Sequence, residues 1–181
     1  MKMNEAFGTP LITPTTKAEF GEHDLPISGE EIVAQELVDG DVWREVEEKA
    51  LALFARGTEV AAERGLILVD TKYEFGIRGG KLYIVDEVHT PDSSRYWYSD
   101  TYAELFAAGK DQRKLDKEFL RKWLMDRNWM GDGPAPEIPD ETKIDVAKKY
   151  IAAYETVTGR AFEPDENTLD DELKRIARYL D

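Results

Sequence analysis

Residues 65–88 read GLILVDTKYEFGIRGGKLYIVDEV, two apolar runs on either side of a Gly-Gly pair. This stretch decides the fold, because two apolar runs around a glycine turn predict an antiparallel β-hairpin. Successive strand residues point to opposite faces, so Asp70, Lys72 and Glu74 lie on one face of the first strand. Three charged side chains on one face indicate either a solvated surface or a binding site.

The register of the hairpin decides between these two interpretations. A three-residue loop at 79–81 would set Glu74 directly across from Asp86, with about 5 Å between the side chains. Opposed carboxylates repel each other, so this register predicts a cation between them, and Mg²⁺ prefers such hard oxygen ligands. A two-residue turn at Gly79–Gly80 would break the pairing, and Lys72 would then neutralise its neighbours on a solvated face.

Composition limits the class of protein. With 181 residues, 41% of them apolar, the chain can bury one core, and we expect a single domain over residues 1–181. The net charge of −14 argues against binding nucleic acid or an anionic membrane surface, and no apolar run is long enough to span a bilayer. The absence of cysteine excludes a disulfide framework and a cysteine nucleophile, and favours a reducing, cytoplasmic location.

Capping signals and apolar spacing predict helices on both sides of the hairpin. Residues 1–25 are expected to form an extended, proline-containing lead-in. Ser28 and Glu31 have the spacing of a capping box for a helix to about Val38, and residues 41–64 repeat apolar positions at helical spacing. Residues 90–100 are expected to form a loop. Three further helices are expected, one from Asp116, one from Asp140 to Gly159 and one from Thr168 to Leu180. The expected fold class is α+β, a central antiparallel hairpin packed against helices.

Three motifs resemble one enzyme family. TPTTKAEFGEHD at residues 13–24, GLILVDTKYEFG at 65–76 and VDEVHTPDSSRYW at 85–97 occur in the order and spacing of the phosphoribosylaminoimidazole-succinocarboxamide synthase (SAICAR synthetase) family of purine biosynthesis. Two later segments, KLDKEFLRKWL at 114–124 and PAPEIPDETKIDVAKKYIAAYETVTGR at 134–160, resemble the C-terminal region of that family. The resemblance therefore extends over almost the whole chain.

The resemblance implies an ATP-dependent amide ligation. ATP would phosphorylate the carboxylate of a carboxyaminoimidazole ribonucleotide, and the amino group of L-aspartate would displace that phosphate. The family pattern puts Glu74 and Asp86 on Mg²⁺, in agreement with the face argument above. It puts Asp70 and Lys72 at the reacting phosphoryl and carboxylate groups as catalytic residues. The implied cofactors are ATP and Mg²⁺.

The same resemblance implies roles for further site residues. Lys17 and Asp24 match residues at the nucleotide end of the family's cleft. Ser94 and Arg95 match residues near the ribonucleotide phosphate, and Arg121 matches a basic residue that faces substrate. The alternatives are a solvated loop lysine for Lys17, a turn residue for Asp24 and a solvated helix face for Arg121.

The histidines and the aromatic residues of these motifs have plainer expected roles. His23 and His89 are the only histidines, and we expect them at the surface or in loops rather than as general bases. Tyr96, Trp97 and Tyr98 are expected to pack under the neighbouring loop rather than to stack on a base.

The family's enzymes begin with an N-terminal lobe, whereas Met1 lies shortly before the first motif. We therefore expect the chain to correspond to the C-terminal portion of such a synthase. A separate N-terminal-lobe partner, or a homo-oligomer, would then cover apolar residues that are otherwise exposed, namely Leu11, Ile12, Leu82 and Ile84. Two alternatives are a non-catalytic module that binds nucleotide and magnesium, and a divergent ligase that acts on another carboxylate.

Overall fold

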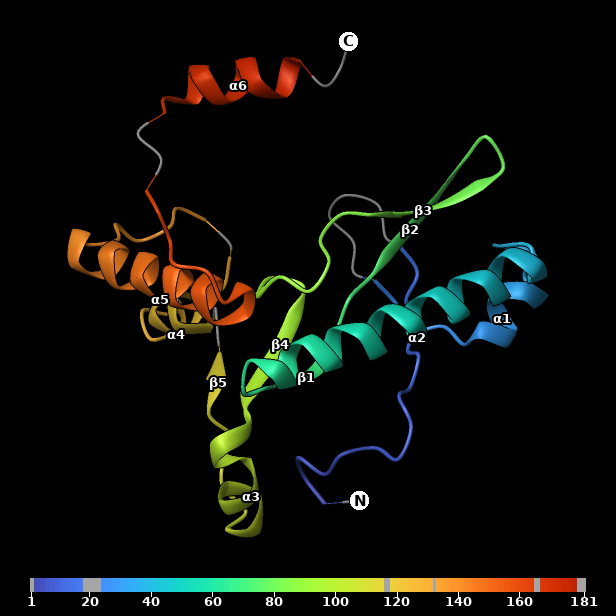
Figure 1. The fold of residues 1–181 in the computed structure, drawn as a ribbon, viewed down its shortest axis with the longest axis horizontal. Coiled ribbons are helices and arrows are strands. Elements are labelled where there is room, and N and C mark those ends of the chain that lie inside the picture. The colour runs from blue at the N-terminus through green and yellow to red at the C-terminus, as the bar shows by residue number, and fades with distance from the viewer. Residues whose placement is uncertain (1, 18–23, 116–117, 132, 165–166, 179–181) are drawn as a thin grey trace.

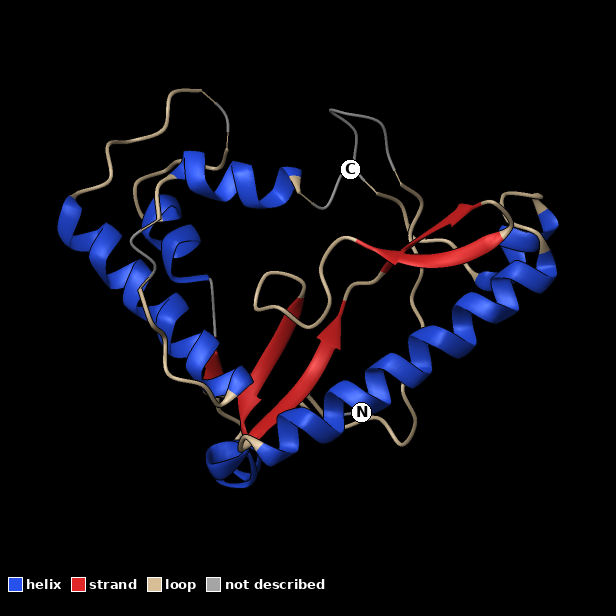
Figure 2. Cartoon of the chain, turned by 45° about the horizontal axis from the view of Figure 1, so that its top comes forward, coloured by secondary structure: helices blue, strands red, loops and turns tan. Residues whose placement is uncertain are grey.

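The chain folds as two helical arms that diverge from a small antiparallel sheet (Figures 1 and 2). The computed structural model describes residues 2–17, 24–115, 118–131, 133–164 and 167–178. One arm is α2 (Gly40–Glu63) and the other is α5 (Asp140–Thr158). Their C-terminal ends meet where Arg64 Nη2 donates to the Thr158 carbonyl at 3.5 Å. The predicted α+β class is confirmed.

The first arm begins with capped helices. Ser28 Oγ accepts from the Glu31 N–H at 3.1 Å while the Glu31 carboxylate accepts from the Ser28 N–H at 2.9 Å, so the predicted capping box is confirmed. That helix, α1 (Gly29–Ala34), is shorter than predicted because the chain soon leaves helical geometry, with a φ of 54° at Glu36. The long helix α2 follows, and Asp39 caps it by accepting from backbone N–H groups of its first turn.

The central sheet has the strand order β1-β4-β5 and is antiparallel throughout. Its strands are β1 (Leu66–Thr71), β4 (Ser94–Tyr98) and β5 (Lys114–Leu115). Two predictions are wrong here. The strand that begins at Leu66 pairs with β4 rather than with residues 82–88, and the segment predicted as a loop holds β4 and the start of α3 (Ser99–Ala107). The pattern SRYWY is aromatic enough for a strand, and its alternate side chains reach the core.

The hairpin is smaller than predicted and stands apart from the central sheet. It consists of β2 (Glu74–Arg78) and β3 (Lys81–Val85), joined by a two-residue turn at Gly79 and Gly80 with φ values of 58° and 74°. Two positive φ angles suit the right-handed twist of a tight hairpin, and glycine adopts them without strain. The shorter turn shifts the register by one residue, so Glu74 pairs with Val85. The predicted pairing of Glu74 with Asp86 is therefore wrong.

The C-terminal part of the chain forms the second arm. α4 (Glu118–Met125) lies beside α5 in Figure 1, and α6 (Leu169–Ala177) starts from a capping box between Thr168 and Asp171. α5 begins at Asp140 as predicted and ends at Thr158, and Gly159, with a φ of 67°, is the expected helix C-cap. The predicted cap at Asp116 lies outside the described residues. Among the described helices, none combines the length and the apolar character needed to cross a membrane.

The hydrophobic core lies where the central sheet meets both arms. It is built from one buried cluster: Ala61, Leu66, Leu68, Tyr96, Leu115 and Ala153. No residue of the β2–β3 hairpin is buried, so this hairpin packs on the helices far less than predicted. The predicted exposure is confirmed for Leu11 and Ile84, which are 61% and 38% exposed, whereas Ile12 and Leu82 are half-buried.

Candidate functional site

The candidate site lies at the junction between the central sheet and the hairpin. β1 ends at Thr71 and β2 starts at Glu74, so Lys72 sits on the short link between the two sheets. Lys72 Nζ lies 2.9 Å from Glu74 Oε1 and 4.0 Å from Asp24 Oδ2. Lys17 donates to the other oxygen of Glu74. Four predicted residues, Lys17, Asp24, Lys72 and Glu74, thus come together, and we call them the Lys72 junction.

Charge pairing sets the protonation states at the Lys72 junction. Hydrogen bonds from Lys17 and then Lys72 lower the pKa of Glu74. The hydrogen bond to Glu74 and the charge of Glu74 raise the pKa of Lys72, and the negative charges of Asp24 and Asp86 raise it further. Glu74 is therefore a carboxylate and Lys72 an ammonium at neutral pH.

Asp86 joins this site from a different position than predicted. It follows the last residue of β3 and adopts a φ of 64°, a conformation that few residues other than glycine adopt. Glu74 begins β2 at the same end of the hairpin, so both carboxylates lie at its open end although they are not paired across it. The charge of Asp86 reaches Lys72, as its contribution to the pKa of Lys72 shows.

The oxygen donors at this end fit a magnesium ion that shares its shell with phosphates. Among the described residues no group of three or more acidic or histidine side chains could enclose a metal ion by itself. Mg²⁺ commonly uses one or two carboxylates and completes its shell with water and nucleotide phosphates. The donor set of Glu74 and Asp86 therefore fits a nucleotide-bound Mg²⁺ rather than a closed structural metal site. The metal assignment of these two residues stays a prediction.

Asp70 and Arg95 form a second polar pair on the central sheet. They are cross-strand partners in β1 and β4. Arg95 Nε donates to Asp70 Oδ1 at 2.8 Å, and its Nη2 contacts Oδ2, which gives a two-pronged ion pair. Such a fork fixes the orientation of the carboxylate. Asp70 is thus held in a single orientation next to the Lys72 junction, two residues before Lys72.

Ser94 lies next to Arg95 but faces the opposite side of the sheet. Its side chain is in the protein interior, with 6% of the residue exposed, and its Oγ lies 2.9 Å from Thr71 Oγ1. This contact joins β1 to β4. The predicted contact of Ser94 with substrate stays a prediction. The buried position of the side chain indicates that Ser94 also has a structural role.

Sequence reasoning missed the part that His89 plays in shaping the site. Its Nε2 lies 2.5 Å from the Tyr73 hydroxyl, and its carbonyl accepts from the Tyr96 hydroxyl at 2.7 Å. Burial raises the pKa of Tyr73 to about 12 and lowers the pKa of His89. The tyrosine is thus protonated and donates to a neutral imidazole. Because Tyr73 stands between Lys72 and Glu74, this bond anchors the junction.

The His89 ring packs directly on α2 at Gly57. A Cβ added at Gly57 would lie 2.3 Å from His89 Cε1, far inside contact distance. A glycine in the interior of a helix costs about 1 kcal/mol relative to alanine, so its presence indicates that another group approaches closely. Gly57 was therefore the signal in the sequence that could have revealed the place of His89.

Arg121 is distant from the Lys72 junction. It is an exposed residue of α4, which lies with α5 in the second arm, whereas the hairpin lies along the first arm (Figures 1 and 2). The structure therefore does not bring this predicted substrate residue to the other predicted residues. His23 lies outside the described residues.

Comparisons with known proteins agree with this architecture. The family model of SAICAR synthetase matches residues 1–136. A phosphoribosylaminoimidazole-succinocarboxamide synthase of Bacteroides thetaiotaomicron is 51% identical over 99% of this chain and 59% of its own length. A Saccharomyces cerevisiae SAICAR-synthase, solved in complex with SAICAR, is 37% identical with a TM-score of 0.71 over 90% of this chain and 51% of that one. A type-2 SAICAR synthetase in complex with ADP is 27% identical with a TM-score of 0.53 over 78% of this chain and 48% of that one.

These matches define the α+β fold of SAICAR synthases as the class of this structure. The chain belongs to the SAICAR synthetase family. It spans about three fifths of the length of the Bacteroides relative, 59%, and about half of the yeast enzyme, 51%. The resemblance inferred from the motifs is confirmed.

Proposed function

We propose that this chain takes part in the ATP-dependent ligation of L-aspartate to a carboxyaminoimidazole ribonucleotide in purine biosynthesis. The observation that carries the proposal is the Lys72 junction, in which Lys72 is held between Glu74 and Asp24 within a chain of this family. The name of the Bacteroides relative and the SAICAR bound to the yeast enzyme support the substrate class. The ADP bound to a further relative supports the use of ATP.

The proposed reaction has two balanced steps. A carboxylate oxygen of the ribonucleotide attacks the γ-phosphorus of ATP, the bond to the bridging oxygen breaks, and ADP leaves. The amine of L-aspartate then attacks the acyl carbon and loses a proton, and phosphate leaves with the oxygen of the broken C–O bond. Both steps build negative charge on oxygen atoms, so fixed cations beside them lower the barrier.

In this proposal Lys72 is the cation that stabilises this charge. Its raised pKa keeps it protonated, and a lysine ammonium acts as a point charge on phosphoryl oxygens. In the proposal, the Asp70 carboxylate lies beside the reacting groups, and its hydrogen bond from Arg95 fixes its orientation. Lys17 and Asp24 are the proposed contacts at the nucleotide end, and Ser94 and Arg95 are the proposed contacts of the ribonucleotide. Arg121, which lies in the other arm, is not part of this proposed site.

Glu74 and Asp86 would hold Mg²⁺ in this proposal. When bound, the ion supplies charge neutralisation at the phosphate oxygens of the nucleotide. Glu74 shares its oxygens with Lys17 and Lys72, so metal binding would replace one of these contacts and release a lysine toward the phosphates.

A second candidate, a non-catalytic module that binds nucleotide and magnesium, is favoured by the openness of the site. The side chains of Lys17 and Lys72 are 80% and 60% exposed. Phosphoryl transfer to a carboxylate competes with water, so an efficient site excludes solvent, and an open site of this kind fits binding better than catalysis.

For the ligase, the junction must therefore be covered. We propose that a lobe-bearing partner or a second copy of the chain covers it through the exposed apolar residues of the hairpin, such as Ile77 and Tyr83, which are 58% and 48% exposed.

Nucleotide binding tests the metal assignment. Calorimetry should show ATP binding more tightly with Mg²⁺ than without it, because the phosphates complete a shell that two carboxylates cannot. Asp86→Asn should remove this difference, whereas Asp111→Asn, at an exposed carboxylate outside the junction, should preserve it. Equal binding of ATP with and without Mg²⁺ in the unaltered chain would show that the assignment is wrong.

Turnover separates the ligase from the binding module. With ATP, aspartate and the ribonucleotide, Lys72→Met should lower kcat by about 10²–10³-fold, the usual cost of losing one group that stabilises charge in the transition state. Lys81→Met, at the exposed first residue of β3 next to the hairpin turn, serves as the matched control. Turnover that is absent in the chain alone and appears on adding an N-terminal lobe supports the shared site. Magnesium-dependent ATP binding without turnover in either state supports the module.

A further inference from the structure

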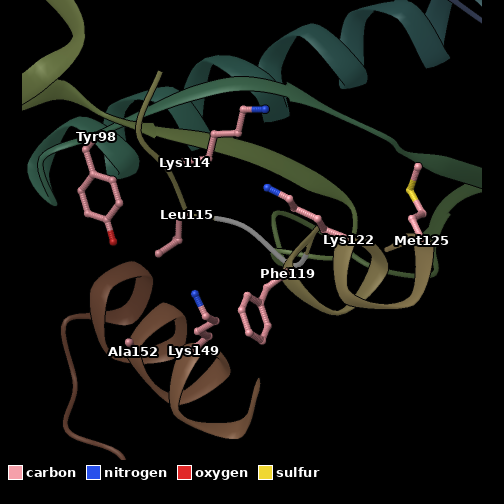
Figure 3. A pocket seen from close by; sticks show the side chains of 8 residues that line it. All are labelled: Tyr98, Lys114, Leu115, Phe119, Lys122, Met125, Lys149 and Ala152. Atoms are coloured by element: carbon pink, nitrogen blue, oxygen red, sulfur yellow. The ribbon is translucent and has the colours of Figure 1, made fainter. Parts of the chain in front are cut away.

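A second polar site lies in the other arm, outside the Lys72 junction. A cavity of about 550 Å³ opens between β5, α4 and α5, and Figure 3 shows the side chains around it. Its walls combine apolar and basic side chains: Leu115, Phe119, Met125, Lys114, Lys122 and Lys149. A volume of this size lies within the usual range for small-molecule pockets, roughly 300–1,000 Å³.

Within the described residues, the three lysines of this pocket have no acidic partner, unlike Lys148 on α5. In the part of the chain that the structure describes, no carboxylate forms a salt bridge with Lys114, Lys122 or Lys149. On the same helix as Lys149, Lys148 is paired with Asp145 at 3.9 Å. Figure 3 shows Lys122 and Lys149 reaching from their two helices toward the space between them, with Lys114 on the β5 wall.

This grouping is unusual for so acidic a chain. With a net charge of −14, the surface as a whole repels anions, so an anion can bind only where cations are gathered. Gathered ammonium groups repel one another unless an anion lies among them. Lysine binds phosphate as a point charge and tolerates several geometries.

The aromatic part of the pocket adds a surface for a flat apolar group. Phe119 carries the Lys149 ammonium over its ring at 4.5 Å. The Tyr98 ring is covered on one side by the Arg113 guanidinium, which lies 3.7 Å from the ring centroid and is paired with Asp100 at 3.3 Å. Basic groups that sit beside aromatic rings suit a ligand that joins an anion to a ring system.

We propose that this pocket binds a phosphate-bearing small molecule of about mononucleotide size. The phosphate lies among Lys114, Lys122 and Lys149, and the organic part lies against Phe119 and Tyr98. This site is additional to the nucleotide site proposed at the Lys72 junction, and it does not depend on that proposal.

The test is a titration of the full chain with AMP, followed by the backbone amide signals in ¹H–¹⁵N spectra. AMP should shift amides of β5, α4 and α5. The double substitution Lys122→Gln and Lys149→Gln should weaken the binding of AMP by at least about tenfold, since hydrogen bonds to charged groups are stronger than those between neutral groups. Lys148→Gln, the matched control on the same helix, should change the affinity less than about twofold because exposed ion pairs contribute little.

Two further probes, inorganic phosphate and adenosine, separate the contribution of the phosphate group from that of the organic part. Inorganic phosphate that binds as tightly as AMP would overturn the proposed contact of the organic part with Phe119 and Tyr98, whereas tighter binding of AMP supports it. Adenosine that binds as well as AMP would overturn the proposal, because the lysines would then contribute nothing. AMP shifts confined to the hairpin, or unchanged affinity in a double variant with a native circular dichroism spectrum, would also overturn it.

Discussion

The central sheet and the β2–β3 hairpin have similar apolar content and opposite surroundings. In β1, Leu66 and Leu68 are 2% and 4% exposed, whereas in the hairpin Ile77 and Ile84 are 58% and 38% exposed. β1 packs on α2 and pairs with β4, while β2 and β3 pair only with each other. Apolar character alone therefore does not determine burial; the neighbouring elements do.

This difference places the Lys72 junction at a boundary between a packed and an exposed part of the fold. An isolated two-stranded hairpin is only marginally stable in water. The ion pairs from Lys17 and Lys72 to Glu74, and the bond between Tyr73 and His89, tie the base of the hairpin to the rest of the molecule. The junction thus joins the buried core to the exposed hairpin.

The largest effect should come from the packed pair. Leu68→Ala should lower the free energy of unfolding by about 2–5 kcal/mol, since it removes a buried side chain and leaves a cavity. Ile77→Ala in the hairpin should change it by less than about 0.5 kcal/mol, because that side chain is already exposed. Urea unfolding of the two variants measures both values. Equal losses would mean that the hairpin side chain is covered in solution, by a second copy or by another part of the chain.

A smaller effect is expected where the loop that carries His89 packs on the first arm. Gly57→Ala gains about 1 kcal/mol of helix propensity but forces the His89 ring aside, and such overpacking costs about 1–3 kcal/mol. We expect a net loss of about 1 kcal/mol in unfolding experiments. In a His89→Ala background the ring is gone, so the same Gly57 substitution should stabilise. A loss of equal size in both backgrounds would show that the ring is not what Gly57 accommodates.

The smallest effect concerns pH. The pKa of Glu74 is lowered from its usual 4.5, so its contribution to stability is present above pH 4.5 and is lost as the pH falls toward the lowered value. The pKa of His89 is lowered from 6.5, so acid opposes folding at this residue once the pH falls below 6.5. Thermal unfolding as a function of pH should show that Glu74→Gln removes part of the loss below pH 4.5 only. A variant with the profile of the unaltered chain would contradict the charge pairing at the junction.

Local patterns were sufficient to predict much of the structure. The capping box at Ser28, the long helix over residues 41–64 and the helix from Asp140 to Gly159 follow from signals within a few residues of each other, and the structure confirms them. The alternation of Asp70, Lys72 and Glu74 likewise pointed to one charged cluster, although only Lys72 and Glu74 contact each other directly.

Long-range pairing was beyond such patterns. The strand at residues 66–71 could pair with any apolar strand, and it pairs with β4 because that arrangement buries Leu66, Leu68 and Tyr96 together. The register of the hairpin depended on whether the turn has two or three residues. That single residue decides which side chain lies opposite Glu74.

By itself, the sequence determined the family, the α+β class, the positions of the two long helices α2 and α5, and the residue types that carry charge at the junction. Only the tertiary structure decided which strands pair, that the charge of Asp86 acts on Lys72, that His89 packs on Gly57, and that Lys114, Lys122 and Lys149 line one pocket. The physical reason is the range over which each kind of interaction acts. Caps and periodicity act between residues close in the chain, whereas packing and charge pairing act between residues close in space, and the chain brings these together only when the whole core forms.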